Sequence, residues 1–377
     1  MIKLLALLVA TAAPGPPTEA QLAAYLEEHG KSPEDYVISK FAAHQVVFLG
    51  EFHRIRHDVE LVQRLIPRLY KAGVRSLALE FAAEELQAEA DRLVTADAYD
   101  PSLARSIMFR WSPIWGYHEY IELYRHAWQL NRSMPKGAPK FRIVHLGYRS
   151  DFSLLQGERT PEVMRKVFHR GDPDVFMAGV IKREFLDKDE KALVYCGRHH
   201  AFTRFQQPIY DRQNQRLIRK LGNRTGNLVY QQAPEKVFLI FLHAPVDALK
   251  SASDLLSPAG GVIDRLMANR FPGRSFGFDL VGAPFGDLPD PESYYSAGME
   301  GFTLKDWGDG YIYTKPLDAY EGVAVEPNFI TDANFAGAVA QLPNPAARAS
   351  LASPKAYLEA LAADADIQRN HFRRLRR

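Results

Sequence analysis

Five short runs of apolar residues, with almost no polar interruption, recur at wide intervals along the chain. They cover residues 46–49, 76–79, 141–146, 192–195 and 237–242. Runs that are apolar throughout, instead of alternating with polar positions, are typical of strands covered on both faces of a sheet. The pattern therefore predicts five buried strands.

Between these runs the apolar positions follow a helical spacing. After the first run, Val59, Val62, Ile66 and Leu69 recur every three or four residues, and Gly73 follows the last of them. This spacing places the four side chains on one helix face, and the glycine marks the end of the helix. Further helices are predicted at residues 83–94, 116–130, 173–186 and 211–221. The alternation predicts an α/β fold with a largely parallel or mixed central sheet flanked by helices.

The pattern changes after about residue 251, where proline and glycine become frequent. This composition predicts a loop-rich C-terminal part with strands at residues 275–280 and 311–314. A helix is expected at residues 354–363, followed by a basic tail at 369–377. We expect residues 18–345 to form a single α/β domain and residues 346–377 to form the C-terminal helix and tail.

The first seventeen residues resemble a leader segment. Lys3 precedes the apolar residues 4–13, which include the small triplet 10–12, and several prolines follow. These features favour a secretory signal and a periplasmic or secreted protein, although a misassigned start and a cytoplasmic location stay open. No other stretch has the roughly 18 apolar residues that span a bilayer, so no transmembrane segment is expected.

Composition narrows the function classes. The chain has 47 Lys and Arg against 45 Asp and Glu, a formal net charge of +2. This balance argues against nucleic acid as a partner and leaves a small molecule or a peptide as the expected substrate. The single cysteine, Cys196, excludes an intramolecular disulfide, and its place at a strand end favours a buried, inert thiol. The chain has no Walker loop and no His-Glu-x-x-His motif.

Acidic and histidine residues follow three of the predicted strands. The first strand leads into Gly50, Glu51 and His53, the second ends in Glu80, and the fourth leads through Gly197 to His200. The ligand crevice of an open α/β sheet lies beyond the carboxyl ends of its strands. The sequence therefore predicts that these side chains meet at one edge of the sheet.

Simpler roles are open for several of these residues. Glu80 needs a partner in a buried setting, which is a metal, a histidine or an arginine such as Arg110. His145 and His243 are expected to be structural, and His57 is expected to support His53 or to lie on the surface. The aromatic stretch 109–115 forms either a wall of the cleft or ordinary packing.

Three motifs together carry a family resemblance. Residues 48–53 (FLGEFH), 77–80 (LALE) and 194–201 (VYCGRHHA) resemble the superfamily of ChaN-like haem-binding proteins, erythromycin esterase-like hydrolases and Tiki-type proteases. Residues 173–181 and 309–313 look like further parts of that pattern. The resemblance spans residues 46–317, and it implies a mixed-sheet α/β core with the glutamates and histidines in a central cleft.

The resemblance implies different chemistry in each branch. In the esterase-like branch the histidine of the first motif looks like a general base supported by the neighbouring glutamate. In the Tiki branch the motifs bind a divalent metal, and in ChaN-like proteins a histidine and neighbouring groups hold haem. Arg198 and His199 stand here where small or amide residues are common in these branches.

The leading hypothesis is an exported hydrolase that activates water against an ester or amide bond. His53 would be the base, Glu51 would orient it, and Glu80 with His200 would position the scissile group or a metal. Zinc, manganese or cobalt suits this set of donors, which His199 would extend. Arg198 or Arg110 would stabilise an oxyanion or a substrate carboxylate.

Two alternatives belong to other function classes. The first is a ChaN-like haem-binding protein without turnover, in which the same histidines and glutamates would hold haem. The second is a member of the superfamily that has lost catalysis and serves as an interaction module.

Overall fold

The computed structural model describes residues 15–375, and a seven-stranded sheet lies at its centre. All seven of these strands coincide with strands predicted from the sequence. In spatial order they are β10 (Phe276–Asp279), β11 (Gly310–Tyr313), β7 (Val237–Leu242), β1 (Val46–Glu51), β4 (Ala192–Gly197), β2 (Ser76–Ala83) and β3 (Arg142–Gly147). Strand β10 is antiparallel to β11, and the other neighbouring pairs are parallel. The sheet is thus mixed and largely parallel.

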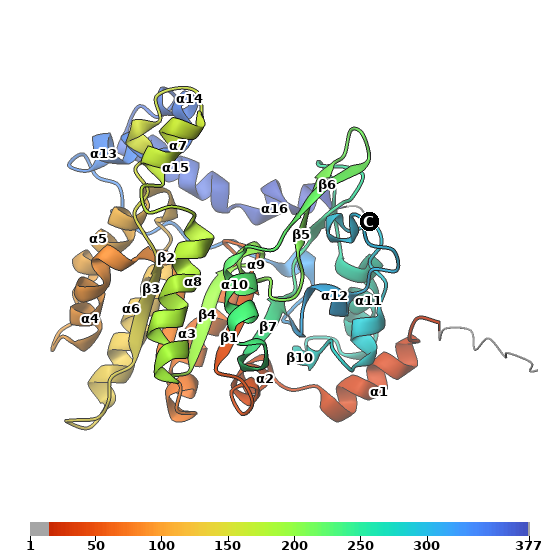
Figure 1. The fold of residues 1–377 in the computed structure, drawn as a ribbon. Coiled ribbons are helices and arrows are strands. Elements are labelled where there is room, and N and C mark those ends of the chain that lie inside the picture. Colours follow the sequence, from red (N-terminus) through yellow and green to blue (C-terminus); the bar gives the residue numbers. More distant parts are fainter. Residues whose placement is uncertain (1–14, 376–377) are drawn as a thin grey trace, which may run out of the picture.

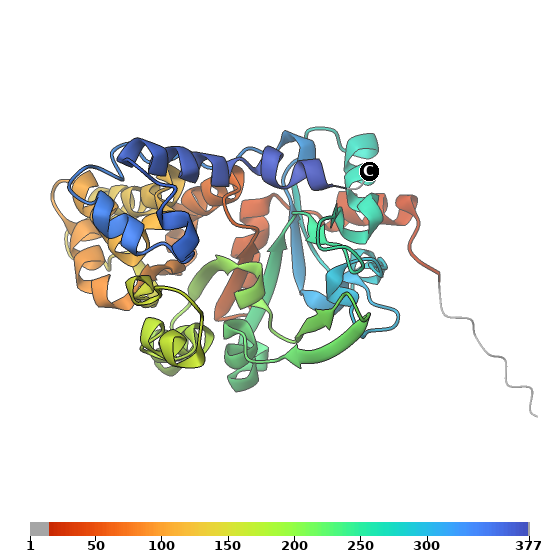
Figure 2. The same ribbon diagram turned by 90° about the horizontal axis from the view of Figure 1, so that it is seen from above.

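Successive residues of the central strand enter two separate hydrophobic layers. Val47 and Leu49 belong to one layer, and Val46 and Phe48 belong to the other. The first layer includes residues of α2 (Pro33–Lys40), α3 (Arg56–Lys71), α4 (Gln87–Thr95), α5 (Pro101–Trp111), α6 (His118–Ser133) and α15 (Pro354–Ala365). The second includes residues of α1 (Glu19–His29), α8 (Pro173–Glu184), α10 (Thr225–Gln232) and α11 (Val262–Arg270). Helices cover both faces (Figure 2), which explains why the strands are apolar throughout.

The register of the parallel strands brings the three predicted motifs together. Glu51, the last residue of β1, is opposite Gly197, the last residue of β4. On the other side of β4, Tyr195 is opposite Leu79 of β2, directly before Glu80. The carboxyl ends of β1, β4 and β2 therefore lie side by side. The short helix α9 (Arg198–Ala201) continues from β4 at this edge.

C-terminal helices lie above this edge of the sheet. Figure 1 shows α13 (Phe335–Ala340), α14 (Pro345–Arg348) and α15 near α7 (Pro161–Val167). The side chain of Gln341, just after α13, donates a hydrogen bond of 2.8 Å to Asp151. The predicted C-terminal helix is confirmed, and it packs on the hydrophobic layer through Tyr357 and Leu361.

The predicted helix at residues 211–221 is wrong. The chain forms a hairpin of β5 (Gln207–Asp211) and β6 (Arg216–Leu221) there, which projects from the body of the molecule (Figure 1). Asp211 accepts hydrogen bonds from the backbone N–H groups of Gln213 and Asn214, and Gln215 adopts a positive φ of 48°. An Asp-centred turn of this kind reverses the chain and prevents a continuous helix.

The predicted helix at residues 83–94 begins later than expected, because β2 continues to Ala83 with a shift of register against β3 after Leu79. The remaining elements are short: α12 (Leu304–Trp307), α16 (Ile367–Asn370), β8 (Val246–Asp247) and β9 (Leu255–Leu256). They confirm the loop-rich C-terminal part. Most of the predicted leader, residues 1–14, and the last two residues of the basic tail lie outside the described residues. Within residues 15–375, no helix is long and apolar enough to cross a membrane.

Candidate active site

Glu51 lies buried at the end of β1 and is surrounded by hydroxyl donors. The hydroxyl of Tyr195, on the neighbouring strand, donates to Oε2 of Glu51. The hydroxyl of Tyr120, on α6, lies 2.8 Å from Oε1 and 2.9 Å from Oε2. Tyr120 itself accepts a hydrogen bond from the backbone N–H of Arg54, so its proton is directed to Glu51. These donors suit a carboxylate, which only accepts hydrogen bonds.

His53 is held by this carboxylate. Its Nδ1 lies 2.7 Å from Oε1 of Glu51. Because the carboxylate accepts, Nδ1 carries the proton, and the neutral ring has its lone pair at Nε2. No residue in the described part of the chain hydrogen-bonds to Nε2. The ring packs edge-on against Trp115 and Phe81, at 5.1 and 5.5 Å between ring centres, and its side chain is 36% exposed.

Glu80 connects the first and third motifs. It lies within β2, at the position where the register against β3 shifts. Its Oε2 accepts a 2.7 Å hydrogen bond from the backbone N–H of Gly197, and its Oε1 lies 3.3 Å from Nε2 of His200. The expected partner of Glu80 is therefore a histidine, and the alternative pairing with Arg110 does not occur.

His200 lies between two carboxylates. Its Nδ1 is 2.6 Å from Oδ1 of Asp174, at the start of α8. Burial lowers the pKa of His200, but the charges of Glu80 and Asp174 outweigh burial and raise it to about 9. The ring is therefore an imidazolium at neutral pH. Its Nδ1–H donates a hydrogen bond to Asp174, and its Nε2 side forms an ion pair with Glu80.

Asp174 has its own set of donors. Its Oδ1 accepts hydrogen bonds of 2.8 and 2.7 Å from the backbone N–H and hydroxyl of Thr225, and its Oδ2 lies 3.1 Å from Arg224. Burial alone would raise the pKa of Asp174, but the hydrogen bonds from His200 and Thr225 lower it overall. Asp174 thus stays ionised and fixes the orientation of His200.

Because Gly197 has no Cβ atom, the His53 ring and the Glu80 carboxylate can both lie close to its backbone. A Cβ atom at this position would lie 2.7 Å from Nε2 of His53 and 3.4 Å from Oε2 of Glu80. Both atoms are therefore close to one point beside the Gly197 backbone. The sequence prediction that Glu51, His53, Glu80 and His200 meet at one edge of the sheet agrees with this geometry.

Three other predicted site residues have different partners. His199 Nε2 lies 2.9 Å from the hydroxyl of Tyr295, and burial, aided by the nearby Arg198, lowers the pKa of His199 to about 3. Arg198 is buried, donates to the carbonyl of Pro245 and stacks over Phe52. Their bonds are thus structural.

Arg110 is also engaged elsewhere. Its guanidinium makes two hydrogen bonds to Glu89, of 2.7 and 2.9 Å. An arginine that is paired with its own neighbouring acid has less charge to offer a substrate. The role predicted for Arg110 in the site rested on its charge alone. Its pairing with Glu89 arises because α4 packs against α5.

The other histidines at strand ends have internal partners, as expected. Nδ1 of His145 lies 2.7 Å from the carbonyl of Ala83, and His243 contacts Tyr311 and Asp264. His57 is buried, and burial lowers its pKa to about 3. Cys196 is buried in the second hydrophobic layer, and burial raises the pKa of its thiol. A buried neutral thiol is a poor nucleophile.

Asp174, Tyr120 and Tyr195 were not found from the sequence. Asp174 stands in the first turn of a predicted helix, where an acid is common for reasons of helix stability. Tyr195 is the last residue of an apolar run, and Tyr120 belongs to a helix with ordinary periodicity. The available signals were that residues 173–181, which include Asp174, look like part of the superfamily pattern and that Tyr195 lies within the motif at residues 194–201.

The predicted donors do not fit a divalent metal. Within residues 15–375, no three His, Cys, Asp or Glu side chains are grouped as a metal site requires. Glu51 is enclosed by Tyr120, Tyr195 and His53, and both nitrogens of His200 face carboxylates. A histidine binds a metal through a neutral nitrogen with a free lone pair, and His53 is the one histidine of this group with such a nitrogen.

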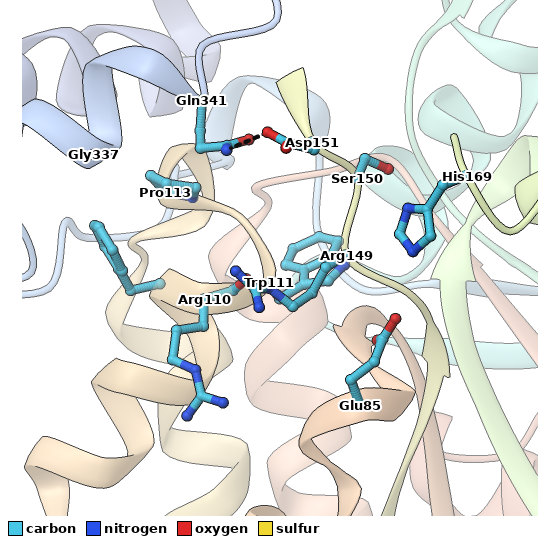
Figure 3. Close-up of a pocket in the computed structure, with 11 residues that line it drawn as sticks. Glu85, Arg110, Trp111, Pro113, Arg149, Ser150, Asp151, His169, Gly337 and Gln341 are labelled. Atoms are coloured by element: carbon cyan, nitrogen blue, oxygen red, sulfur yellow. Dashed lines mark hydrogen bonds between the residues drawn. The ribbon is translucent and has the colours of Figure 1, made fainter. Parts of the chain in front are cut away.

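A cavity of about 500 Å³ lies behind the aromatic residues that contact His53. Trp111 lines it, and this ring is 5.7 Å from Trp115, which packs on His53. Figure 3 shows that the guanidinium of Arg110 points away from Asp151 and Gln341, which face each other across a hydrogen bond. Residues 109–113 of the aromatic stretch thus contribute to the lining of this cavity, and Trp115 packs on His53.

The chain also contains a Gly-x-Ser-x-Gly sequence at residues 273–277. In hydrolases with a nucleophilic serine this motif forms a sharp turn from a strand into a helix. Ser275 instead precedes strand β10. The motif here therefore lacks the setting of a nucleophile.

No protein-family model and no curated protein matches the chain. Among solved structures, a succinoglycan biosynthesis protein is 10% identical, with a TM-score of 0.55, over 83% of this chain and 100% of that protein. An erythromycin esterase, EreC, is 12% identical, with a TM-score of 0.45, over 78% and 94%. ChaN of Campylobacter jejuni, solved with haem, is 15% identical, with a TM-score of 0.37, over 59% and 89%. At 10% identity, the likeness to the succinoglycan biosynthesis protein concerns the fold alone.

Proposed function

We propose that the chain is a hydrolase of ester or amide bonds in which His53 activates water. One observation carries the proposal. Glu51 holds Nδ1 of His53, and Nε2 is left without a partner beside Glu80 and Gly197. A positioned imidazole with a free nitrogen is the usual general base, and such a base accelerates hydrolysis by roughly 10²- to 10⁴-fold.

Glu51 stabilises the histidine as it takes up the proton. The ring becomes an imidazolium when water attacks, and the buried carboxylate 2.7 Å from Nδ1 offsets this charge. The imidazolium then gives the proton to the leaving alcohol or amine, which regenerates the base. The acid of a catalytic triad acts on its histidine in the same way. Tyr120 and Tyr195 donate hydrogen bonds to Glu51 and fix its orientation.

Glu80 and His200 complete the site. Oε2 of Glu80, fixed by the N–H of Gly197, is an acceptor for the second proton of the attacking water. The His200 imidazolium contacts Oε1 of Glu80, so it offsets the charge of this carboxylate and holds it in place beside His53.

The proposal includes an exported location, supported by the leader-like pattern of residues 1–17. It uses no metal ion, because the described donors do not fit one.

The proposal is tested with the purified chain and a panel of 4-nitrophenyl esters and 4-nitroanilides, with and without a chelator. We expect hydrolysis of at least one substrate above the rate of the uncatalysed reaction, and an unchanged rate after chelation. The absence of turnover across the panel would contradict the proposal. Loss of activity on chelation, with recovery on addition of zinc, manganese or cobalt, would contradict its metal-free form.

A second candidate function is haem binding, favoured by one observation. The free Nε2 of His53 belongs to a partly exposed ring flanked by Trp115 and Phe81, which suits an axial ligand of haem. Hydrolysis accounts for more of the site, because it gives roles to Glu80 and to the Asp174 and His200 pair. A Soret shift on titration with haemin, lost in His53→Ala, would support haem binding. An unchanged haemin spectrum at a stoichiometric ratio would exclude it.

A further inference from the structure

A second cavity, of about 580 Å³, adjoins the site on the side of His200 and Asp174. Its walls are formed by α7 with the start of α8, by His200 of α9, and by the segment from β6 to α10. Its charged lining residues are Arg165, Asp172, Asp174, His200, Arg219 and Arg224. The cavity thus shares two residues with the proposed catalytic group.

The lining of this cavity has unequal numbers of positive and negative side chains. Asp174 is compensated by His200 and Arg224, at 2.6 and 3.1 Å. Within residues 15–375, no carboxylate oxygen lies within the 4.0 Å of an ion pair from Arg165 or Arg219. Asp172, whose Oδ1 accepts the backbone N–H of Asp174 at the start of α8, is the one further acid of the lining. Positive charge therefore exceeds negative charge in the cavity.

We propose that this cavity binds a carboxylate or phosphate group of the substrate whose ester or amide bond is hydrolysed at His53. The inference rests on the proposed function, and it adds the substrate class. Arginine guanidinium groups present paired N–H donors that match the oxygens of both anions. Because His200 belongs to both the cavity and the catalytic group, an anion held in the cavity would place the adjoining part of the substrate beside that group.

The anion preference is measured with two esters of equal chain length. Mono-4-nitrophenyl glutarate ends in a carboxylate, and 4-nitrophenyl pentanoate ends in a methyl group. We expect kcat/KM to be higher for the glutarate ester, mainly through a lower KM. Equal values for the two esters, or a preference for the pentanoate ester, would overturn the inference and leave the proposed function in place.

Two variants assign this preference to the cavity. Arg219→Gln and Arg165→Gln should each lower the ratio of the two kcat/KM values by about two- to fivefold, as expected for partly exposed ion pairs. Both side chains are exposed, so the variants should fold. The matched controls are Lys220→Gln and Lys166→Gln, which remove the same charge from a neighbouring position outside the cavity lining. A ratio that falls equally in the controls would contradict the assignment.

A binding measurement separates this inference from the proposed function. Titration calorimetry with glutarate and, separately, with inorganic phosphate should detect binding to the wild type that weakens in the Arg219→Gln and Arg165→Gln double variant. Such a result without any ester or amide turnover would refute the hydrolase and retain the anion site. No difference between the wild type and the double variant for either probe would refute the anion site.

Discussion

Oδ1 of Asp174 lies 2.6 Å from Nδ1 of His200, although the two residues are 26 positions apart and belong to different helices. The contact repeats the relation between Glu51 and His53 at the other end of the site. The two histidines differ in their second nitrogen. Nε2 of His200 faces the carboxylate of Glu80, while Nε2 of His53 has no hydrogen-bond partner among residues 15–375. The carboxylates beside His200 hold that ring as a cation, whereas the open nitrogen of His53 can accept a proton.

Asp174→Asn should lower the pKa of His200 from about 9 toward its ordinary value, because the variant removes one of the two charges that raise it. Titration of the histidine ring signals by NMR measures this shift. Asp172→Asn is the matched control, because Asn also caps a helix well and Asp172 does not contact His200. An unchanged pKa of His200 in Asp174→Asn would contradict the assignment of its charge.

The His200 pKa also predicts a pH dependence of stability. Its folded pKa of about 9 lies above the ordinary value of 6.5, so its stabilising contribution is complete below about pH 6.5 and is lost as the pH rises through about 9. We expect the free energy of unfolding to fall by about 1–3 kcal/mol across this window relative to His200→Gln. Urea unfolding of both proteins at the two ends of the window measures the difference. Parallel curves for the two proteins would contradict it.

Tyr195→Phe should impair both stability and catalysis. The variant removes a hydroxyl donor from the buried Glu51, which costs about 1–3 kcal/mol of unfolding free energy. Because Glu51 holds His53, kcat/KM should fall by roughly tenfold. Tyr124→Phe is the control: this fully buried hydroxyl bonds to His145, remote from Glu51, so stability should fall and kcat/KM should not. Equal losses of kcat/KM in Tyr195→Phe and Tyr124→Phe would contradict the prediction, because the loss would then follow from lower stability and not from the contact with Glu51.

Gly197→Ala should displace His53 at little cost in stability. The new Cβ would lie 2.6 Å from Cε1 of the His53 ring, and the backbone of Gly197, at φ −57°, accepts alanine without strain. We expect kcat/KM to fall by roughly tenfold or more, because a base must stay within hydrogen-bond reach of its water. Gly179→Ala, in α8 with no atom near its Cβ position, is the matched control and should keep full activity. Full activity of Gly197→Ala would contradict the position of His53.

The sequence was sufficient to predict the sheet edge and the residues that follow its strands. Apolar runs identify buried strands, and parallel strands present their carboxyl ends together, so Glu51, His53, Glu80 and His200 could be grouped without coordinates. Asp174 could not, because its partner is fixed by how α8 packs beside α9 and α10. Packing of this kind leaves no local pattern in the chain.

Residue type alone did not predict how the charged residues pair within the chain. Arg110, Arg198 and His199 were expected in the site by residue type, and the structure gives each an internal partner. A helix was predicted at residues 211–221 because the apolar spacing there suits a helix. The turn at Asp211 and the pairing of β6 with β5 form a hairpin at residues 207–221 instead.

The central claim is that the free Nε2 of His53 is the base that activates water. Its most direct test is the value of kcat/KM for wild type and His53→Gln on one hydrolysed 4-nitrophenyl ester, from about pH 5 to pH 9, with the unfolding midpoint of each protein. We predict a loss of roughly 10²-fold or more in His53→Gln at an unchanged midpoint. A His53→Gln protein that is folded and retains a rate within about threefold of the wild type would contradict the account.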